Sequence, residues 1–151
     1  MHKSIFAIDV GGVLASKQHD GEPTIYSLES IQYLSNFFDC WIVSMCGKQR
    51  ALQTRMWLFR EGFERFIPPA KQIYIPFSAG NKNEVLKDIN ACFFIDDREK
   101  HLKPAAELVS LDCVYKFDPS TLPNRDNPWV MVPDWLALTT DLLMWADRNR
   151  C

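Results

Sequence analysis

The feature that most constrains this chain is a regular alternation between short apolar runs and segments with helical periodicity. A strand buried on both faces of a parallel sheet is apolar throughout, and parallel strands need a long crossover, usually a helix, between them. The alternation therefore predicts an α/β fold, with a Rossmann-like parallel sheet of about five strands and helices on both faces. The predicted strands are residues 4–10, 40–45, 72–77, 91–95 and 111–117.

Three of the predicted helices are defined by apolar residues at helical spacing, which we expect to face the core. The first begins after Ser27, a favoured N-cap, the second ends near Gly62, and the last begins near Pro133, a favoured first-turn residue. Their predicted core-facing residues are Leu28, Ile31, Leu34 and Phe38 in the first, Leu52, Met56, Phe59 and Phe63 in the second, and Trp135, Leu138, Leu142 and Trp145 in the last.

Two further helices are predicted between the third and fifth strands. Asn81 and Glu84 have the spacing of a capping box, which marks the start of one of them. Residues 104–109 form the other, with a less regular pattern. Residues 118–132 contain several prolines and no clear period, so they are predicted to be a long irregular loop packed by its own side chains.

The length and the cysteine usage limit the class of protein. A chain of 151 residues fits one domain. The five cysteines form no C-x-x-C pair and lie mostly in apolar runs, which favours reduced, buried thiols over a disulfide framework or a zinc site. No apolar stretch approaches the roughly 20 residues of a membrane span, and the N-terminus lacks the layout of a signal peptide. A cytoplasmic protein without a membrane partner is expected.

Polar side chains end or follow four of the predicted strands. Asp9 ends the first strand, Ser44 the second, and Asp96 and Asp97 the fourth, while Lys82 follows the third. The carboxyl ends of parallel strands lie on one rim of the sheet, and ligands of open α/β sheets bind outside that rim. These side chains are therefore expected to converge.

These strand ends resemble, in order, the four motifs of the haloacid dehalogenase-like (HAD) superfamily. The run ending in DVGGVL is similar to the first motif, in which an apolar strand ends in DxDGT or DxDGV. The run ending in Ser44 is similar to the second, Lys82 to the third, and FFIDDR to the fourth. Each motif is weak alone, but the four in order are specific. The resemblance implies a HAD-like domain that transfers phosphoryl groups with Mg²⁺.

The resemblance assigns the metal chemistry to the two acidic strand ends. Asp9 is implied as the nucleophile that attacks phosphorus to give an aspartyl-phosphate, and also as a ligand of Mg²⁺. The backbone carbonyl of Gly11 and the carboxylate of Asp96 are implied as further ligands, with Asp97 in contact with the metal or one layer out. Oxygen ligands of this kind suit Mg²⁺.

Phosphate binding is implied for a second set of residues. Ser44 would donate a hydrogen bond to a phosphate oxygen, together with backbone N–H groups at Gly11, Gly12 and the start of the helix after Ser44. Lys82 would neutralise both the nucleophile and the phosphate. Arg98 either binds substrate or only neutralises the acidic pair before it.

Gly11 departs from the family pattern. Most family phosphatases carry a second aspartate there, which protonates the leaving group and then activates water, and general acid–base help of this kind contributes about 10²–10⁴-fold. Three interpretations remain open. The protein hydrolyses only good leaving groups such as acyl or aryl phosphates, another residue (His19, Asp20 or Glu22) substitutes, or the protein binds without turnover.

Several other charged residues are predicted to lie at the surface. Lys87 is a rival for the lysine of the third motif, although an exposed helical lysine is the simpler interpretation. Lys48, Arg50 and Arg55 are predicted to form a solvated helix face rather than a substrate patch, and His101 is predicted to be a surface residue.

The predicted function follows from these motifs. The intervals in which the family inserts cap domains are filled by the predicted helices and strand, so we expect an open site without a cap. We predict a Mg²⁺-dependent phosphohydrolase. Because its site is open, its phosphorylated substrate can be a macromolecule. The alternative is a catalytically impaired HAD-like domain that binds a phosphorylated ligand or a protein partner. A nucleotide or polynucleotide phosphatase is a third option, which the net charge of −2 and the lack of a basic stripe disfavour.

Overall fold

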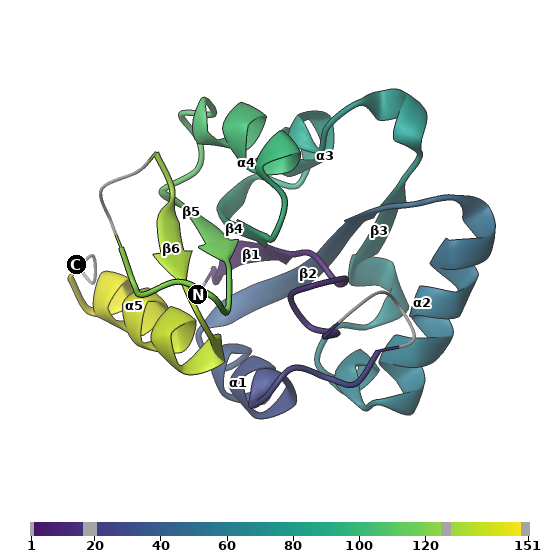
Figure 1. Ribbon diagram of the computed structural model, residues 1–151, viewed down its shortest axis with the longest axis horizontal. Helices are drawn as coiled ribbons and strands as arrows, with labels where there is room; N and C mark the ends of the chain where they lie inside the picture. The colour runs from purple at the N-terminus through teal and green to yellow at the C-terminus, as the bar shows by residue number, and fades with distance from the viewer. Residues whose placement is uncertain (1, 17–20, 125–127, 149–151) are drawn as a thin grey trace.

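The computed structural model describes residues 2–16, 21–124 and 128–148. In this part of the chain six strands form one sheet, in the order β3-β2-β1-β4-β5-β6, and every pairing is parallel (Figure 1). The α/β class and the parallel sheet are therefore confirmed. The strands are β1 (Ser4–Ile8), β2 (Phe38–Met45), β3 (Gln72–Ile75), β4 (Ala91–Asp96), β5 (Cys113–Phe117) and β6 (Val130–Val132).

Helices cover both faces of the sheet, as predicted. Figure 1 shows α1 and α5 on one face and α3 and α4 on the other. Alternate residues of β1 serve the two faces: Phe6 and Ile8 pack into a core shared with α1, α2 and α5, and Ala7 packs into a smaller core beneath α3 and α4. The helices are α1 (Ser27–Leu34), α2 (Lys48–Arg60), α3 (Asn83–Asp88), α4 (Glu99–Ala106) and α5 (Trp135–Arg148), with short 3₁₀ turns η1 (Phe63–Arg65), η2 (Pro69–Lys71) and η3 (Phe77–Ala79).

The sixth strand corrects the prediction of about five strands and of an irregular loop over residues 118–132. β6 pairs in parallel with β5, with Tyr115 opposite Val130 and Phe117 opposite Val132. Only three residues long, β6 is too short to show a period, and the prolines around it are typical of loops. The edge of the sheet was therefore hidden in the sequence.

Two helix boundaries also differ from the prediction. Ser27 is the first residue of α1 rather than its N-cap: Tyr26 holds the cap position with a φ of 64°, and the buried Ser27 hydroxyl has no partner among the described residues. The helix predicted at residues 104–109 is α4, which begins at Glu99 directly after β4 and contains Pro104 in its interior. A proline more often opens a helix than continues it, and this displaced the predicted start.

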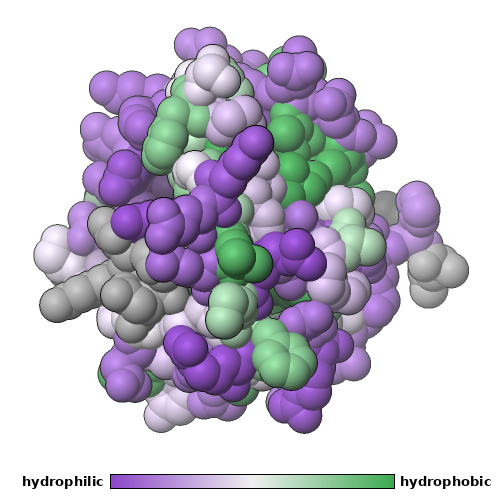
Figure 2. Space-filling view, turned by 90° about the vertical axis from the view of Figure 1, so that its right-hand side faces the viewer, coloured by the Kyte–Doolittle hydropathy of each residue, from purple (hydrophilic) through white to green (hydrophobic). Residues whose placement is uncertain are grey.

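The predicted core face of α2 is wrong at three of its four residues, whereas the fourth, Phe63, is buried as predicted. Leu52, Met56 and Phe59 are 58%, 59% and 71% exposed, whereas Trp57 is buried. Figure 2 looks onto the side of the molecule that α2 occupies, and apolar side chains stand there among hydrophilic ones. The indole of Trp57 stacks on Phe63, with ring centroids 5.4 Å apart, and turns α2 so that this residue faces inward. Gly62, with a φ of 89°, follows the end of α2 as predicted.

The last helix agrees better with its pattern. Trp135, Leu138 and Leu142 are fully buried in the larger core. The N-terminus of α5 is capped by Asp134, whose Oδ1 accepts the backbone N–H of Ala137 at 2.8 Å. The helix thus begins two residues after the predicted Pro133.

Two indole groups hold the loop that follows β1. Trp57 of α2 donates its N–H to the carbonyl of Gly21 at 2.9 Å, and Trp135 of α5 donates to the carbonyl of Val13 at 3.0 Å. The hydroxyl of Thr24 also donates to the carbonyl of Val13. The described parts of this loop are therefore fixed to the helix layer on one face of the sheet.

Two further expectations concern the state of the cysteines and membrane-spanning helices. Cys40, Cys46, Cys92 and Cys113 are free thiols, the first two of them buried, while Cys151 lies outside the described residues. Within the described ranges, every helix is too short or too polar to cross a membrane.

We expect Trp135→Phe to destabilise the fold, because it removes the donor that serves the carbonyl of Val13 and the hydroxyl of Thr24. Loss of a buried hydrogen bond of this kind costs about 1–3 kcal/mol. Thermal melting should show a lower Tm than in Trp129→Phe, a control that removes an indole from the smaller core on the other face. Equal melting temperatures for the two variants would show that the hydrogen bonds of the Trp135 indole do not stabilise the fold.

Candidate active site

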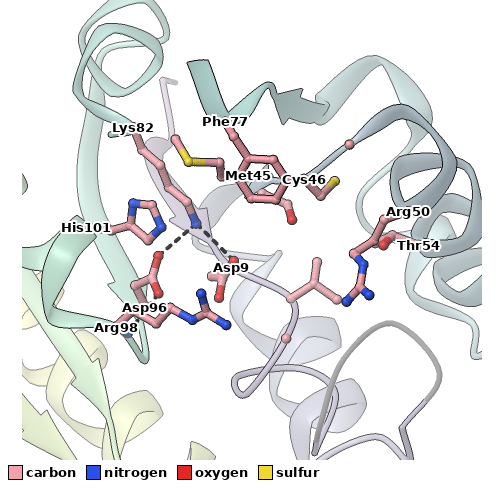
Figure 3. Close-up of a pocket in the computed structure, with 14 residues that line it drawn as sticks. Asp9, Met45, Cys46, Arg50, Thr54, Phe77, Lys82, Asp96, Arg98 and His101 are labelled. Atoms are coloured by element: carbon pink, nitrogen blue, oxygen red, sulfur yellow. Dashed lines mark hydrogen bonds and ion pairs between the residues drawn. The ribbon is translucent and has the colours of Figure 1, made fainter. Parts of the chain in front are cut away.

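The carboxyl ends of β1, β2 and β4 enclose one polar cavity. β1 lies between β2 and β4, and the backbone N–H of Asp9 donates to the carbonyl of Ile95 at 3.1 Å, which sets Asp9 beside the end of β4. Asp9, Ser44 and Asp96 all line a cavity of about 410 Å³ (Figure 3). The convergence predicted from the strand ends is therefore found.

Lys82 enters this cavity from the start of α3. The side chain of Asn81 caps the helix by accepting the N–H of Asn83 at 2.9 Å, and Lys82 itself occupies the N-cap position that the capping box assigned to Asn81. The Lys82 side chain is only 1% exposed. Its Nζ donates to Asp9 Oδ1 at 2.9 Å, to Asp96 Oδ2 at 2.8 Å and to the carbonyl of Val43 at 2.9 Å.

The rival lysine does not reach this cavity. Lys87 is exposed on the outer side of α3, whereas Lys82 is buried between two carboxylates. Of the two lysines that the sequence left open, Lys82 is thus the one that contacts the carboxylates.

Burial and charge act in opposite directions on the two carboxylates. Burial, together with the neighbouring Asp96, raises the pKa of Asp9 to about 8, although Lys82 opposes the shift. Burial also disfavours ionised Asp96, but the ammonium of Lys82 overcomes it and holds the pKa of Asp96 below its ordinary value. The two carboxylates raise the pKa of Lys82 despite its burial. A further cation at this point would favour the ionised form of Asp9.

Asp97 completes an acidic cluster. Carboxylate oxygens of Asp9, Asp96 and Asp97 lie within 4.8 Å of one another. Burial and the charge of Asp96 raise the pKa of Asp97 to about 6, and its buried Oδ1 has no hydrogen-bond partner among the described residues. An unpartnered buried carboxylate oxygen beside two other carboxylates fits a hard divalent cation such as Mg²⁺. Asp9, Asp96 and Asp97 would hold it, with the carbonyl of Gly11 at the cavity edge as a further oxygen.

Gly12 makes room for Asp97. Its φ is +79°, and a Cβ placed on it would lie 2.2 Å from Asp97 Oδ2. A side chain at this position would therefore need both a strained backbone and a displaced carboxylate. Gly12 was predicted to bind phosphate, but the contact that the structure shows is this close approach to the acidic cluster.

Ser44 and the N-terminus of α2 form the second wall. Ser44 is buried one residue before the end of β2, and Gly47 is the N-cap of α2, whose first residue is Lys48. Ser44 and Gly47 both line the cavity. Free N–H groups at a helix N-terminus attract anions, so this wall is suited to phosphate oxygens.

Arg98 lines the cavity next to the acidic cluster. Its backbone N–H donates to Asp96 Oδ1 at 3.0 Å, and Arg98 and Asp9 both line the cavity (Figure 3). Among the described residues the guanidinium makes no ion pair, but its charge acts to lower the pKa of Asp97 against the effects of burial and Asp96, so both interpretations of Arg98 stay open. Arg98 remains available to an anionic ligand.

Three residues of the cavity wall were missed or misplaced by the sequence. His101 is buried rather than at the surface, and its burial and the nearby Lys82 lower its pKa to about 4, so it is neutral.

Arg50 was assigned to a solvated face, yet it is half-buried and lines the cavity with Thr54, one turn further along α2. Lys48 and Arg55 are exposed as predicted. The spacing of apolar residues gave the wrong rotation of α2 about its axis. With the correct rotation, Arg50 would have been predicted to face the cavity.

Of the substitutes proposed for the missing acid, Glu22 finds no support in this geometry. Glu22 is exposed and does not line the cavity. His19 and Asp20 lie outside the described residues, so their role stays a prediction.

Comparison with solved structures connects this cavity to a known fold. The chain is similar to a candidate haloacid dehalogenase-like hydrolase from Burkholderia xenovorans LB400, with a TM-score of 0.64 and 13% identity over 96% of this chain and 99% of that one. It is also similar to the candidate HAD-hydrolase YfnB from Bacillus subtilis, solved with bound magnesium, with a TM-score of 0.60 and 18% identity over 82% of this chain. The match spans 58% of the YfnB chain.

These likenesses establish that the chain has the fold of HAD-like hydrolases, as its motifs predicted. No protein-family model and no curated protein matches the sequence.

We expect Lys82→Met to lower the free energy of unfolding by about 3–5 kcal/mol at neutral pH, because it leaves two buried carboxylates without their cation. Lys87→Met, an exposed change on the same helix, should stay within about 0.5 kcal/mol of the wild type. Denaturant unfolding measures both. Equal stability of the two variants would show that the ion pairs contribute little.

We expect Gly12→Ala to weaken Mg²⁺ binding by roughly 10–100-fold, the usual effect of disturbing a group that orients a metal ligand. Gly80→Ala is the matched control, since Gly80 has a φ of +81° but open space around its Cβ position. The Gly80→Ala variant has the backbone strain without a clash, so titration calorimetry should find its Mg²⁺ affinity equal to that of the wild type. An equal loss of affinity in both variants would assign the effect to the backbone alone.

Proposed function

We propose that this protein is a Mg²⁺-dependent phosphohydrolase that forms an aspartyl-phosphate at Asp9. The observation that carries the proposal is the buried contact of Lys82 with Asp9 and Asp96, beside an acidic cluster that fits a divalent cation. The fold of HAD-like hydrolases and the magnesium bound in one structural neighbour support it.

Each residue of the cavity then has a defined task. Lys82 holds the carboxylate of Asp9 in place by a 2.9 Å hydrogen bond while the phosphate dianion approaches. When bound, Mg²⁺ would supply the positive charge that lets two anions meet. Ser44 and the N-terminus of α2 orient the phosphoryl oxygens, and Arg98 adds a further positive charge to the cavity.

The reaction proceeds in two displacements. A carboxylate oxygen of Asp9 forms a bond to phosphorus, the bond from phosphorus to the leaving oxygen breaks, and its electron pair departs with that oxygen. Water then attacks the phosphorus of the aspartyl-phosphate, which releases inorganic phosphate and restores Asp9. Dividing one difficult hydrolysis into two displacements is the advantage of a covalent intermediate.

The leaving group restricts the substrate class. Gly11 provides no acid, and the carboxylates among the described residues that line the cavity are Asp9 and Asp96, both paired with Lys82. His101 is neutral at physiological pH, since its pKa is lowered to about 4. The favoured substrates are therefore acyl and aryl phosphates, whose leaving oxygens depart without a proton. The open cavity allows the rest of the substrate to be large.

Gly11 also favours a second candidate function. A HAD-like domain without the acid–base residue would bind a phosphorylated ligand or protein partner through the same cavity and not turn it over. This alternative uses the same metal and phosphate contacts, so turnover is what distinguishes the two functions.

We expect Mg²⁺-dependent release of phosphate from acetyl phosphate and from an aryl phosphate by the wild type, and none by Asp9→Asn. The Asp112→Asn variant, which changes an exposed acid outside the cavity, should retain wild-type turnover. Gly11→Asp should accelerate hydrolysis of a poorer alkyl leaving group, by up to about 10²–10⁴-fold if the new carboxyl reaches it.

Two results would contradict parts of this scheme. Undiminished turnover in Asp9→Asn would exclude Asp9 as the nucleophile. Mg²⁺ binding by a stably folded wild type without release of phosphate from either substrate would favour the binding domain over the phosphohydrolase.

A further inference from the structure

The mouth of the cavity carries an exposed aromatic ring. Phe77 is 63% exposed, yet it lines the same cavity as Asp9 and Lys82. A side chain that is largely exposed and also lines a cavity stands at its opening. Single exposed apolar residues are common on protein surfaces, but this one belongs to the wall of the proposed active site. Aromatic side chains in such walls are the groups that contact the apolar parts of ligands.

Phe77 continues an apolar wall that begins at the end of β2. Met45 pairs with Ile75 in the sheet, and the backbone N–H of Cys46 donates to the carbonyl of Ile75 at 3.0 Å. The turn η3 begins two residues after Ile75, with Phe77 as its first residue. Met45, Cys46 and Phe77 all line the cavity, and Figure 3 shows them together on one side of it, apart from Asp96. A thioether and a free thiol are soft, apolar groups that pack well against aromatic rings.

The geometry of phosphoryl transfer directs the leaving group towards this wall. The attacking and leaving oxygens lie roughly in line, on opposite sides of the phosphorus. Asp9 is only 9% exposed and contacts the buried Lys82, so the side of the phosphorus away from Asp9 faces the opening. Phe77 stands at that opening. The group that leaves therefore meets a phenyl ring as it extends out of the cavity.

We propose that Phe77 determines specificity by stacking on an aromatic leaving group, so that the substrate class is an aryl phosphate rather than an acyl phosphate. The inference rests on the proposed function, under which the lack of an acid at Gly11 admits both classes. An aromatic ring gains from contact with Phe77 and Met45, whereas a small acyl group has little apolar surface to bury there. In the first displacement the bond from phosphorus to the phenolic oxygen breaks, and its electron pair leaves with that oxygen as a phenolate, which water then protonates.

Two phosphonates test this preference without turnover, because their carbon–phosphorus bond is not hydrolysed. Benzylphosphonate has a methylene group in place of the phenolic oxygen of phenyl phosphate, and acetonylphosphonate has one in place of the bridging oxygen of acetyl phosphate. Titration calorimetry in the presence of Mg²⁺ measures the affinity of each. Stacking of a ligand ring on an aromatic side chain strengthens binding by roughly 5–150-fold, so benzylphosphonate should bind the wild type tighter than acetonylphosphonate by a factor in that range.

Variants of exposed phenylalanines assign the preference to one ring. Phe77→Ala should reduce the ratio of the two affinities to near 1, and Phe77→Tyr, which keeps an aromatic ring, should retain most of it. Both variants are expected to fold, because the side chain that they change is largely exposed. Phe59→Ala is the matched control: Phe59 is 71% exposed on α2 and does not line the cavity, so its ratio should be that of the wild type.

The outcomes separate this inference from the proposed function. Equal binding of the two phosphonates by the wild type would overturn the inference alone. A preference for benzylphosphonate that survives Phe77→Ala, or that is lost equally in Phe59→Ala, would do the same. Failure of both phosphonates to bind in the presence of Mg²⁺ would overturn the proposed function and the inference with it.

Discussion

One buried ammonium holds the carboxyl rim of this sheet together. The pairing of β1 with β4 brings Asp9 and Asp96 side by side, and two carboxylates at this depth would repel each other strongly without a cation between them. Lys82 meets this need with three acceptors for its three N–H groups, two carboxylates and the carbonyl of Val43. The same contact therefore stabilises the fold and positions the proposed nucleophile.

Much of this arrangement could be predicted because it follows from strand order. Apolar runs mark the central strands, and the first polar residue after a buried strand of a parallel sheet must lie at its carboxyl rim. Asp9, Ser44 and Asp96 were predicted in this way, whereas the choice between Lys82 and Lys87 required the structure. The short strand β6 could not be found, since three residues among prolines carry no period.

The rotation of a helix about its axis was the information that the sequence lacked. α2 has apolar residues on two faces, and spacing alone favoured the face of Leu52, Met56 and Phe59, which the structure exposes. The contacts of the Trp57 indole with Gly21 and Phe63 decide the rotation, and Gly21 lies 36 positions from Trp57 in the chain, outside any helical pattern. The same rotation brings Arg50 to the cavity. The packing of the Trp57 indole therefore decides both which residues of α2 enter the core and which line the site.

The bond from Trp135 to Val13 joins positions 122 residues apart in the chain. Contacts of such long sequence separation form late and slow the folding of a domain, because the intervening chain must first be ordered. The loop that continues from the proposed nucleophile thus reaches its final packing only after α5 has docked. During synthesis, which proceeds from the N-terminus, the first motif leaves the ribosome long before α5, so the loop after Asp9 acquires its final surroundings only when α5 has been made.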